Sequence, residues 1–210
     1  MRWPGPRRTS PVLLTILLAL GAGWSAHADP DAEPRPGMVV VAPRRFHGAL
    51  REFQAYRSAG RPTELAALEA ILQETDGVDD PERLKRWLYR AWRERGVGYA
   101  LLVGDADVVP VRYMVLDRVT PAAFDYAFYP SDLYYADVAR RDGGFDDWNA
   151  RSDGVHAGYF GEVRGEKNKA DPINFDRVDY RPELAVGRWP VDSAAKVRIV
   201  AEKTMAYERG

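Results

Sequence analysis

Two aspartates follow an apolar run in YALLVGDADVVP, residues 99–110, and they are the first residues of this sequence that could do chemistry. An apolar run that ends at Gly104 is typical of a strand buried on both faces of a parallel sheet. Such sheets carry binding and catalytic groups at the carboxyl ends of their strands. Asp105 and Asp107 could therefore shape a pocket for a basic residue or hold a cation. We favour a structural role, in which the Asp105 carboxylate accepts hydrogen bonds from backbone N–H groups of its own turn.

A second group of polar residues lies in DDWNARSDGVHAGYFGE, residues 146–162. Calcium prefers several hard oxygen ligands on flexible backbone, which this segment offers. The candidate metal ligands are Asp147, Asn149, Asp153 and Glu162. Their spacing is not that of an EF-hand loop, because the twelfth position counted from Asn149 is Phe160 rather than an acid. A solvated acidic loop explains the same residues equally well, so both interpretations stay open.

The sequence shows no complete set of residues for nucleophilic catalysis. The sequence contains no cysteine, so it supplies no thiolate. His47 lies at the start of a predicted helix, where a half-exposed structural histidine is the expected role, and His27 and His156 are not credible bases. Ser131 precedes Asp132 but has no visible adjacent base. We therefore assign no catalytic residue.

The elements that must position these residues alternate between strand and helix in the first half of the chain. MVVVAP, residues 38–43, predicts a buried strand, and apolar spacing from Arg44 onward predicts a helix that ends at residues 58–60. Residues 62–72 are ambiguous between helix by propensity and strand by position. Residues 80–96 predict a helix with Asp80 as its cap, Pro81 in its first turn and a core-facing apolar stripe.

After the strand of residues 99–103 and the apolar segment VRYMVL, residues 117–182 are aromatic, acidic and rich in turns, which indicates a functional loop or an insertion. Within them, YPSDLYYADV, residues 129–138, predicts a strand, and its aromatic residues suit core packing better than a peptide-binding wall. ELAVGRWPV, residues 183–191, predicts a further strand, and Asp192 is the expected cap of a final helix. The alternation indicates an α/β fold with a mostly parallel sheet covered by helices.

Targeting features occupy the first residues of the chain. Residues 1–28 combine early arginines, an apolar run and Ala-His-Ala, which predicts a signal peptide rather than a membrane anchor. They contain three arginines and no acid, so the formal net charge of −1 becomes −4 without them, which argues against a nucleic-acid partner. Residues 29–37 predict a flexible leader. We expect a secreted or periplasmic protein with no membrane span after signal cleavage.

Several segments in order resemble a known family. YALLVGDADVVPVRY, SDLYYADV, DDWNARSDGVHAGYFGE and PELAVGRWPVDSAAKVRIVAEKTMAYERG resemble the first half of the catalytic domain of the gingipain family of secreted cysteine peptidases, over residues 38–210. The resemblance implies a caspase-like α/β sandwich, incomplete at its C-terminus, in an exported proenzyme that often binds calcium. It also implies a Cys nucleophile and a His partner in later blocks that follow this segment in the family. His47-Gly48 matches the dipeptide of the family's histidine block but not its place at the end of a strand.

These observations predict an exported gingipain-like endopeptidase domain that lacks the Cys/His dyad and is inactive alone. Residues 38–210 would form its amino-terminal part, and a peptide or protein substrate would bind once a downstream segment completes it. No cofactor is required for the chemistry, and calcium would have a structural role. The alternative is a secreted, non-catalytic module of the same fold that binds calcium or a protein partner.

Overall fold

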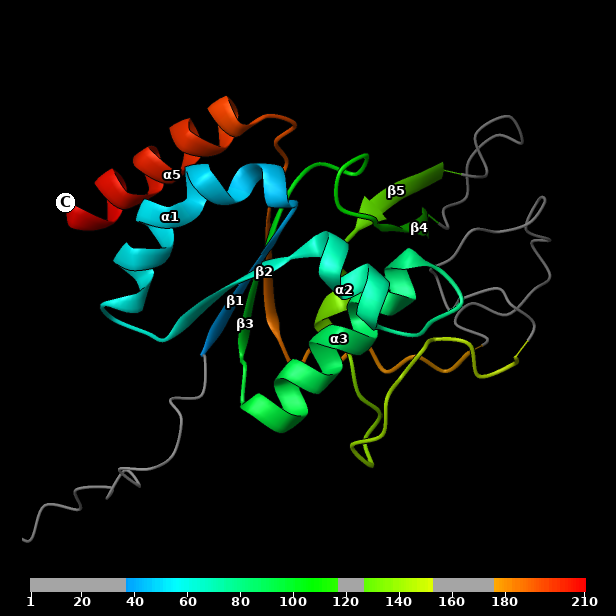
Figure 1. The fold of residues 1–210 in the computed structure, drawn as a ribbon. Helices are drawn as coiled ribbons and strands as arrows, with labels where there is room; N and C mark the ends of the chain where they lie inside the picture. The colour runs from blue at the N-terminus through cyan, green and yellow to red at the C-terminus, as the bar shows by residue number, and fades with distance from the viewer. Residues whose placement is uncertain (1–36, 117–126, 153–175) are drawn as a thin grey trace, which may run out of the picture. The chain divides into compact units, whose positions relative to one another are not determined.

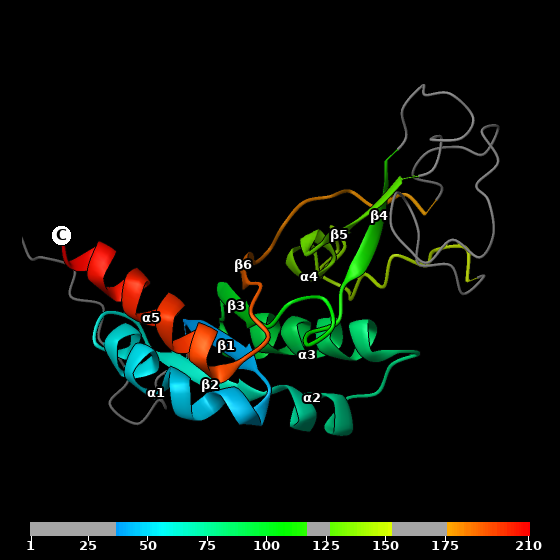
Figure 2. The same ribbon diagram turned by 90° about the horizontal axis from the view of Figure 1, so that it is seen from above.

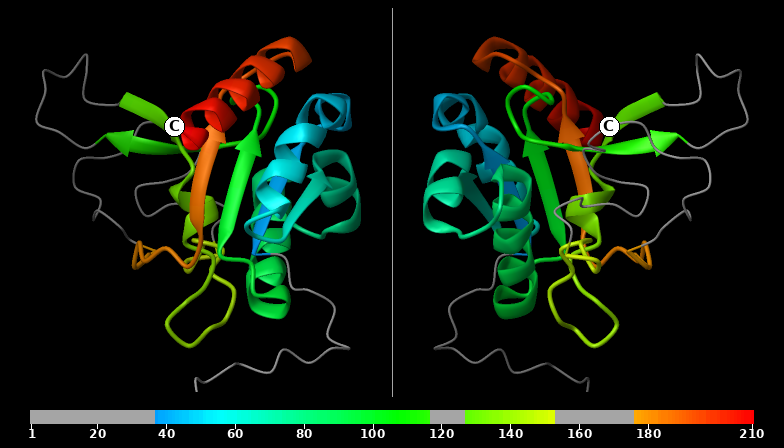
Figure 3. Two further views of the ribbon diagram at one scale, coloured as in Figure 1. Left: turned by 90° about the vertical axis from the view of Figure 1, so that its left-hand side faces the viewer. Right: turned by 90° about the vertical axis from the view of Figure 1, so that its right-hand side faces the viewer.

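The computed structural model describes residues 37–116, 127–152 and 176–210. Four parallel strands form the main sheet in the order β2-β1-β3-β6 (Figure 1). They are β1 (Met38–Ala42), β2 (Thr63–Ala67), β3 (Tyr99–Val103) and β6 (Ala185–Trp189). The strands expected at residues 38–43, 99–103 and 183–191 are therefore confirmed, with β6, drawn in orange in Figure 3, at one edge beside β3.

Alternate residues of the central strands face two separate cores. Val39 and Val41 of β1 belong to a core with α2 (Leu68–Glu74), α3 (Asp80–Arg95) and α4 (Leu133–Ala136). Val40 and Ala42 belong to a second core with α1 (Arg44–Ser58) and α5 (Ala194–Arg209), which lie side by side (Figure 2). Because a parallel sheet needs cover on both faces, this arrangement confirms the predicted α/β class.

Two helix caps lie one residue away from the predicted positions. Asp79, not Asp80, is the N-cap of α3, since its carboxylate accepts the Glu82 N–H at 3.0 Å. In α5 the N-cap is Ser193, whose Oγ accepts the Lys196 N–H at 3.5 Å. Asp80 and Asp192, which the sequence suggested, instead form ion pairs with side chains of the first turn. Each pair of neighbouring cap formers offers two choices locally, because both side chains can accept hydrogen bonds from N–H groups of the first turn.

Two segments change conformation part-way along. Residues 62–72 contain both β2 and the beginning of α2, so the conflict between helix propensity and strand position is resolved by having both. The strand predicted at residues 129–138 is wrong in its second half, because β5 (Ala127–Ser131) ends where α4 begins. Ser131 Oγ accepts the Leu133 N–H at 3.3 Å and starts that turn.

A second, smaller sheet consists of β4 (Arg112–Leu116) and β5, which pair antiparallel with Arg112 opposite Ser131. The predicted signal peptide, the leader up to residue 36 and half of the predicted insertion at 117–182, namely residues 117–126 and 153–175, lie outside the described residues. Within the described part of the chain, no helix is both long enough and apolar enough to cross a membrane.

Candidate functional site

The turn after β3 is built by backbone bonds to the end of β6. The N–H of Gly104 donates to the Trp189 carbonyl at 2.9 Å, and the N–H of Asp105 donates to the Val191 carbonyl at 3.1 Å. Gly104 has a φ of 153°, and a Cβ there would lie 2.7 to 2.9 Å from the side chains of Val108 and Val109. Only glycine allows this close approach, so residue 104 determines how the chain leaves the sheet.

The guanidinium of Arg188, on β6, holds this turn in place. Its Nε and Nη2 donate to the two carboxylate oxygens of Asp132, each at 2.8 Å. Its Nη1 donates to the Gly104 carbonyl at 2.8 Å and to the Val109 carbonyl at 3.0 Å. Longer bonds reach the carbonyls of Asp105 and Pro110, both at 3.3 Å. One cation therefore joins β6, the turn after β3 and the residue before α4, and we call this group the Arg188 clasp.

The structure corrects the expected role of Asp105. Its carboxylate does not cap the turn: Oδ1 is buried and accepts no hydrogen bond. The backbone carbonyl of Asp105 closes the turn instead, because it accepts hydrogen bonds from the N–H groups of Val108 and Val109 at 3.1 and 2.9 Å. Asp107 is exposed to solvent. Both aspartates lie at the carboxyl end of β3 as expected, but the group that organises this edge is Arg188, which sequence reasoning treated only as part of a family block.

The other residues considered for catalysis have structural partners. His47 lies in α1, half-buried, with Nε2 3.1 Å from the Ala42 carbonyl at the end of β1. Ser131 is engaged by the backbone of α4, and Asp132 by the Arg188 clasp. The described residues at this edge thus place no nucleophile beside a base. What this arrangement can do is hold the ends of the strands in a fixed geometry.

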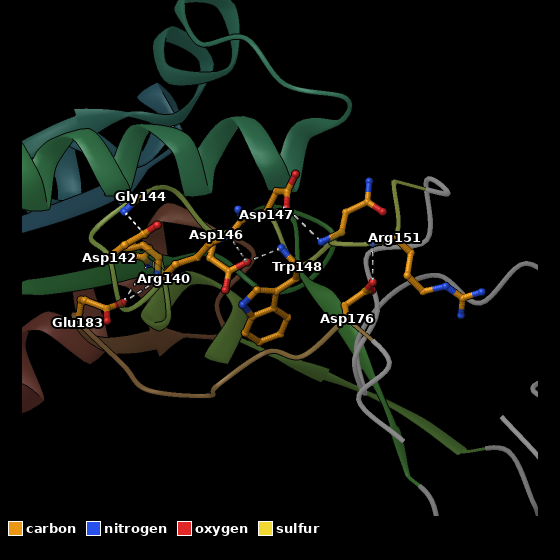
Figure 4. Close-up of polar contacts among 12 residues, drawn as sticks. Arg140, Asp142, Gly144, Asp146, Asp147, Trp148, Arg151, Asp176 and Glu183 are labelled. Carbon is orange, nitrogen blue, oxygen red and sulfur yellow. Dashed lines mark hydrogen bonds and ion pairs between the residues drawn. The ribbon is translucent and has the colours of Figure 1, made fainter. Parts of the chain in front are cut away.

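The acidic segment that the sequence singled out is partly described (Figure 4). Asp146 Oδ1 accepts the Trp148 N–H, and Asp147 Oδ1 accepts the Asn149 N–H, both at 3.1 Å. Asn149 Oδ1 is buried and accepts no hydrogen bond. Asp147 and Asn149 therefore lie next to each other as expected, whereas Asp153 and Glu162 lie outside the described residues. Nowhere in the described ranges do three acidic, histidine or cysteine side chains come together in a geometry that could hold a metal ion.

A buried lysine and a buried aspartate lie close to this segment, and sequence reasoning missed both. Lys85 of α3 and Asp137, directly after α4, are each 0% exposed. Burial lowers the pKa of Lys85 to about 7, against an opposing effect of Asp146, Asp137 and Asp147. Burial likewise raises the pKa of Asp137 to about 7, although the charge of Lys85 opposes this rise. The signal for Lys85 was its position beside Leu84 and Leu88 on the apolar stripe of the helix.

Comparison with known proteins identifies the family. A sequence profile described as Peptidase family C25 matches residues 31–210, most of the chain. The chain belongs to peptidase family C25. This confirms the resemblance to gingipains drawn from the ordered sequence blocks. A search of curated protein sequences found no significant match.

Solved structures of gingipain R are similar to this chain at low identity. The Arg-specific cysteine proteinase gingipain R has a TM-score of 0.49 and 16% identity, covering 84% of this chain and 29% of its own. A complex of the pro- and mature domains of RgpB from Porphyromonas gingivalis has a TM-score of 0.48 and 17% identity, covering 81% of this chain and 28% of its own. This chain therefore spans less than a third of the length of either solved protein.

The Arg188 clasp generates a prediction about stability. Replacing Arg188 with Met leaves the Asp132 carboxylate and several turn carbonyls without their donor, so we expect a loss of about 3 kcal/mol in the free energy of unfolding. Urea denaturation measures this loss. Arg198→Met on the exposed surface of α5 is the matched control and should unfold like the wild type. If Arg188→Met also unfolded like the wild type, the clasp would not support the fold.

Lys85 and Asp137 predict a minimum in stability near pH 7. The pKa of Asp137 is raised from 3.8, so the folded state binds more protons between these values and stability rises as the pH falls below 7. The pKa of Lys85 is lowered from 10.5, so the unfolded state binds more protons above pH 7 and stability rises with pH.

Urea unfolding across this pH range should show the minimum in the wild type and not in the double variant Lys85→Met/Asp137→Asn. The double variant removes both titrations and preserves the approximate side-chain volumes, which often keeps a buried pair site folded. Parallel pH profiles for the two proteins would contradict the assignment.

Proposed function

We propose that this C25 chain is the scaffold part of an exported cysteine-type endopeptidase and does not cleave peptides alone. The observation that carries this proposal is the family match over residues 31–210 in a sequence without cysteine. C25 peptidases are cysteine peptidases, and a thiolate nucleophile has no substitute here. On this proposal the reacting sulfur and its histidine partner would come from outside these residues.

The geometry at the carboxyl edge of the sheet supports this division. Catalysis needs a nucleophile and a base held within hydrogen-bond reach of each other. At this edge the described side chains are instead used in holding the chain, with Arg188 bound to Asp132 and to turn carbonyls. A rigid edge of this kind can support a neighbouring catalytic segment, because reacting groups must be positioned within a fraction of an ångström.

The proposed organisation follows the sequence. Residues 1–28 would be a signal peptide, residues 29–37 a leader, and residues 38–210 the amino-terminal part of the peptidase domain, with the loop-rich insertion at about 117–182. The protein would be secreted or periplasmic. Its partner would be a peptide or protein substrate, bound after a segment with the family's His-Gly and Ala-Cys blocks completes the domain.

Proteolytic assays test this proposal. The chain expressed without residues 1–28 should show no turnover of peptides with Arg or Lys before the cleaved bond, under reducing conditions in which gingipain R serves as a positive control. Peptide turnover that co-purifies with the protein through every step would overturn the claim that the chain alone is catalytically inactive. Joining the chain to a segment with both blocks should produce turnover that a thiol-alkylating reagent abolishes.

A second candidate function is that of a secreted non-catalytic module that binds calcium or a protein partner. The buried, unpartnered Oδ1 of Asn149 beside Asp147 favours it, because such an oxygen suits a hard cation. Asp147 and Asn149 would hold the ion together with Asp153 and Glu162. Calcium would then supply structural stability and take no part in bond cleavage.

Calcium-dependent melting tests this second function. If the ion binds the folded chain, saturation at a hundred times its dissociation constant should add about 2.7 kcal/mol, and EDTA should remove it. Asn149→Ala should abolish the response to calcium. Asp107→Asn, which changes an exposed acid at the end of β3, is the control and should respond like the wild type. A melting temperature that changes with neither calcium nor EDTA would exclude the calcium site.

A further inference from the structure

A cavity of about 640 Å³ lies at the amino ends of β1 and β3, at the opposite edge of the sheet from the Arg188 clasp. Met38 and Tyr99, the first residues of these two strands, are part of its lining. The end of α1, the turn that follows it and the end of α5 supply further lining residues, among them Tyr56, Arg57, Arg61 and Glu208. The volume is within the usual range of sites for small ligands.

Arg61 brings an unpaired positive charge to this cavity. Its guanidinium carbon lies 3.6 Å from the centroid of the Tyr99 ring, close enough for attraction between the cation and the ring face. In the part of the chain that the structure describes, no carboxylate forms an ion pair with Arg61. The N–H groups of a guanidinium lie in its plane, so a ring on its face leaves them able to bind an acceptor.

The surrounding chain fixes the position of the Arg61 side chain. A Cβ on Gly37 would lie 2.9 Å from Arg61 Cγ, so the Gly37 backbone packs closely against the stem of this side chain. The N–H of Arg61 donates to the Arg57 carbonyl at 2.9 Å, and Thr63 Oγ1 donates to the Arg61 carbonyl at 2.8 Å. A cation that is already held in place loses less conformational entropy when it binds an anion.

The other charged residues of the lining form an ion pair with each other. Arg57 Nη2 lies 2.5 Å from Glu208 Oε1, so this pair is neutral and the lining residues carry one net positive charge, that of Arg61. Arg57 Nε is buried and has no hydrogen-bond partner among the described residues. The single net charge suits a monoanion, because the Glu208 carboxylate would repel a second negative charge on the same ligand.

We propose that this cavity binds a carboxylate carried on an apolar body, with Arg61 as the donor to the carboxylate. The guanidinium fork matches the two oxygens of a carboxylate, and Met38, Tyr56 and Tyr99 offer apolar surface beside it. A free organic acid and the C-terminus of a peptide both have this chemistry. The cavity lies at the edge of the sheet away from the strand ends considered for catalysis, so the inference is independent of the proposed peptidase function.

Calorimetric titration of the chain expressed without residues 1–28 tests the site. N-acetyl-phenylalanine and 3-phenylpropionate should bind, because each joins one carboxylate to a phenyl ring. N-acetyl-phenylalaninamide, which lacks the charge, should bind about tenfold more weakly than N-acetyl-phenylalanine. Equal affinity for the acid and its amide would overturn the proposal, as would the absence of binding by both acids.

The two acids also distinguish the sources of the ligand. Tighter binding of N-acetyl-phenylalanine would support the site and identify a peptide C-terminus as its ligand, whereas binding of 3-phenylpropionate that is as tight or tighter would support a free organic acid. Inorganic phosphate should bind more weakly than either acid. Phosphate affinity equal to that of the acids would overturn the assignment to a carboxylate.

Variants of Arg61 test the donor. Arg61→Met should weaken binding of the tighter acid about tenfold, and Arg61→Lys should restore only part of the affinity because a lysine cannot bind a carboxylate bidentately. Arg51→Met changes an exposed arginine of the same helix and is the matched control, which should bind like the wild type. Wild-type affinity in Arg61→Met would overturn the proposal.

Tyr99→Leu keeps the proposal testable if the Arg61 variants do not fold, which thermal unfolding will show. This change removes the ring that contacts the guanidinium and leaves Arg61 in place. Affinity for the tighter acid should fall, by less than in Arg61→Met. Unchanged affinity in a folded Tyr99→Leu variant would count against a cation held ready by this ring.

Discussion

The Arg188 guanidinium is the interaction on which the carboxyl edge of the sheet depends. Parallel strands end at this edge with carbonyl groups that no further strand pairs, and buried carbonyl groups need donors. Arg188 supplies them to four carbonyls while binding both oxygens of Asp132. The planar fork of an arginine suits this task, whereas a lysine could not reach the carboxylate bidentately. The same residue thus satisfies the turn and attaches the chain before α4.

The second constraint is the burial of charge between α3 and the acidic segment. Moving an ammonium and a carboxylate out of water is costly, and Lys85 and Asp137 are both fully buried. Their pKa values move toward each other for that reason, each to about 7. The rings of Tyr134 and Trp148, whose centroids lie 4.1 and 4.6 Å from Nζ, replace part of the lost hydration of Lys85. This part of the core therefore combines packing with electrostatics, whereas the core between the sheet and the α1 and α5 helices consists of apolar residues.

Membership of peptidase family C25 gives these two features a common interpretation. A peptidase domain has to hold its reacting groups in a fixed geometry, and the residues that do so need not react. In this chain Arg188 binds Asp132 and the turn carbonyls at the strand ends, and Lys85 contacts the Tyr134 ring two residues further along.

The sequence by itself determined most of the elements, the α/β class, the family and the absence of a thiolate. Apolar runs and helical spacing depend on neighbours a few residues away, so β1, β3, β6 and the long helices could be placed from them. The predicted helix caps were each one residue too far along or too early: the caps are Asp79 and Ser193, because adjacent polar residues compete for the same N–H groups. Only the tertiary structure decided which charges meet. Arg188 and Asp132 are 56 residues apart, and Lys85 of α3 contacts Tyr134 of α4, so both contacts depend on the order of strands and helices in space.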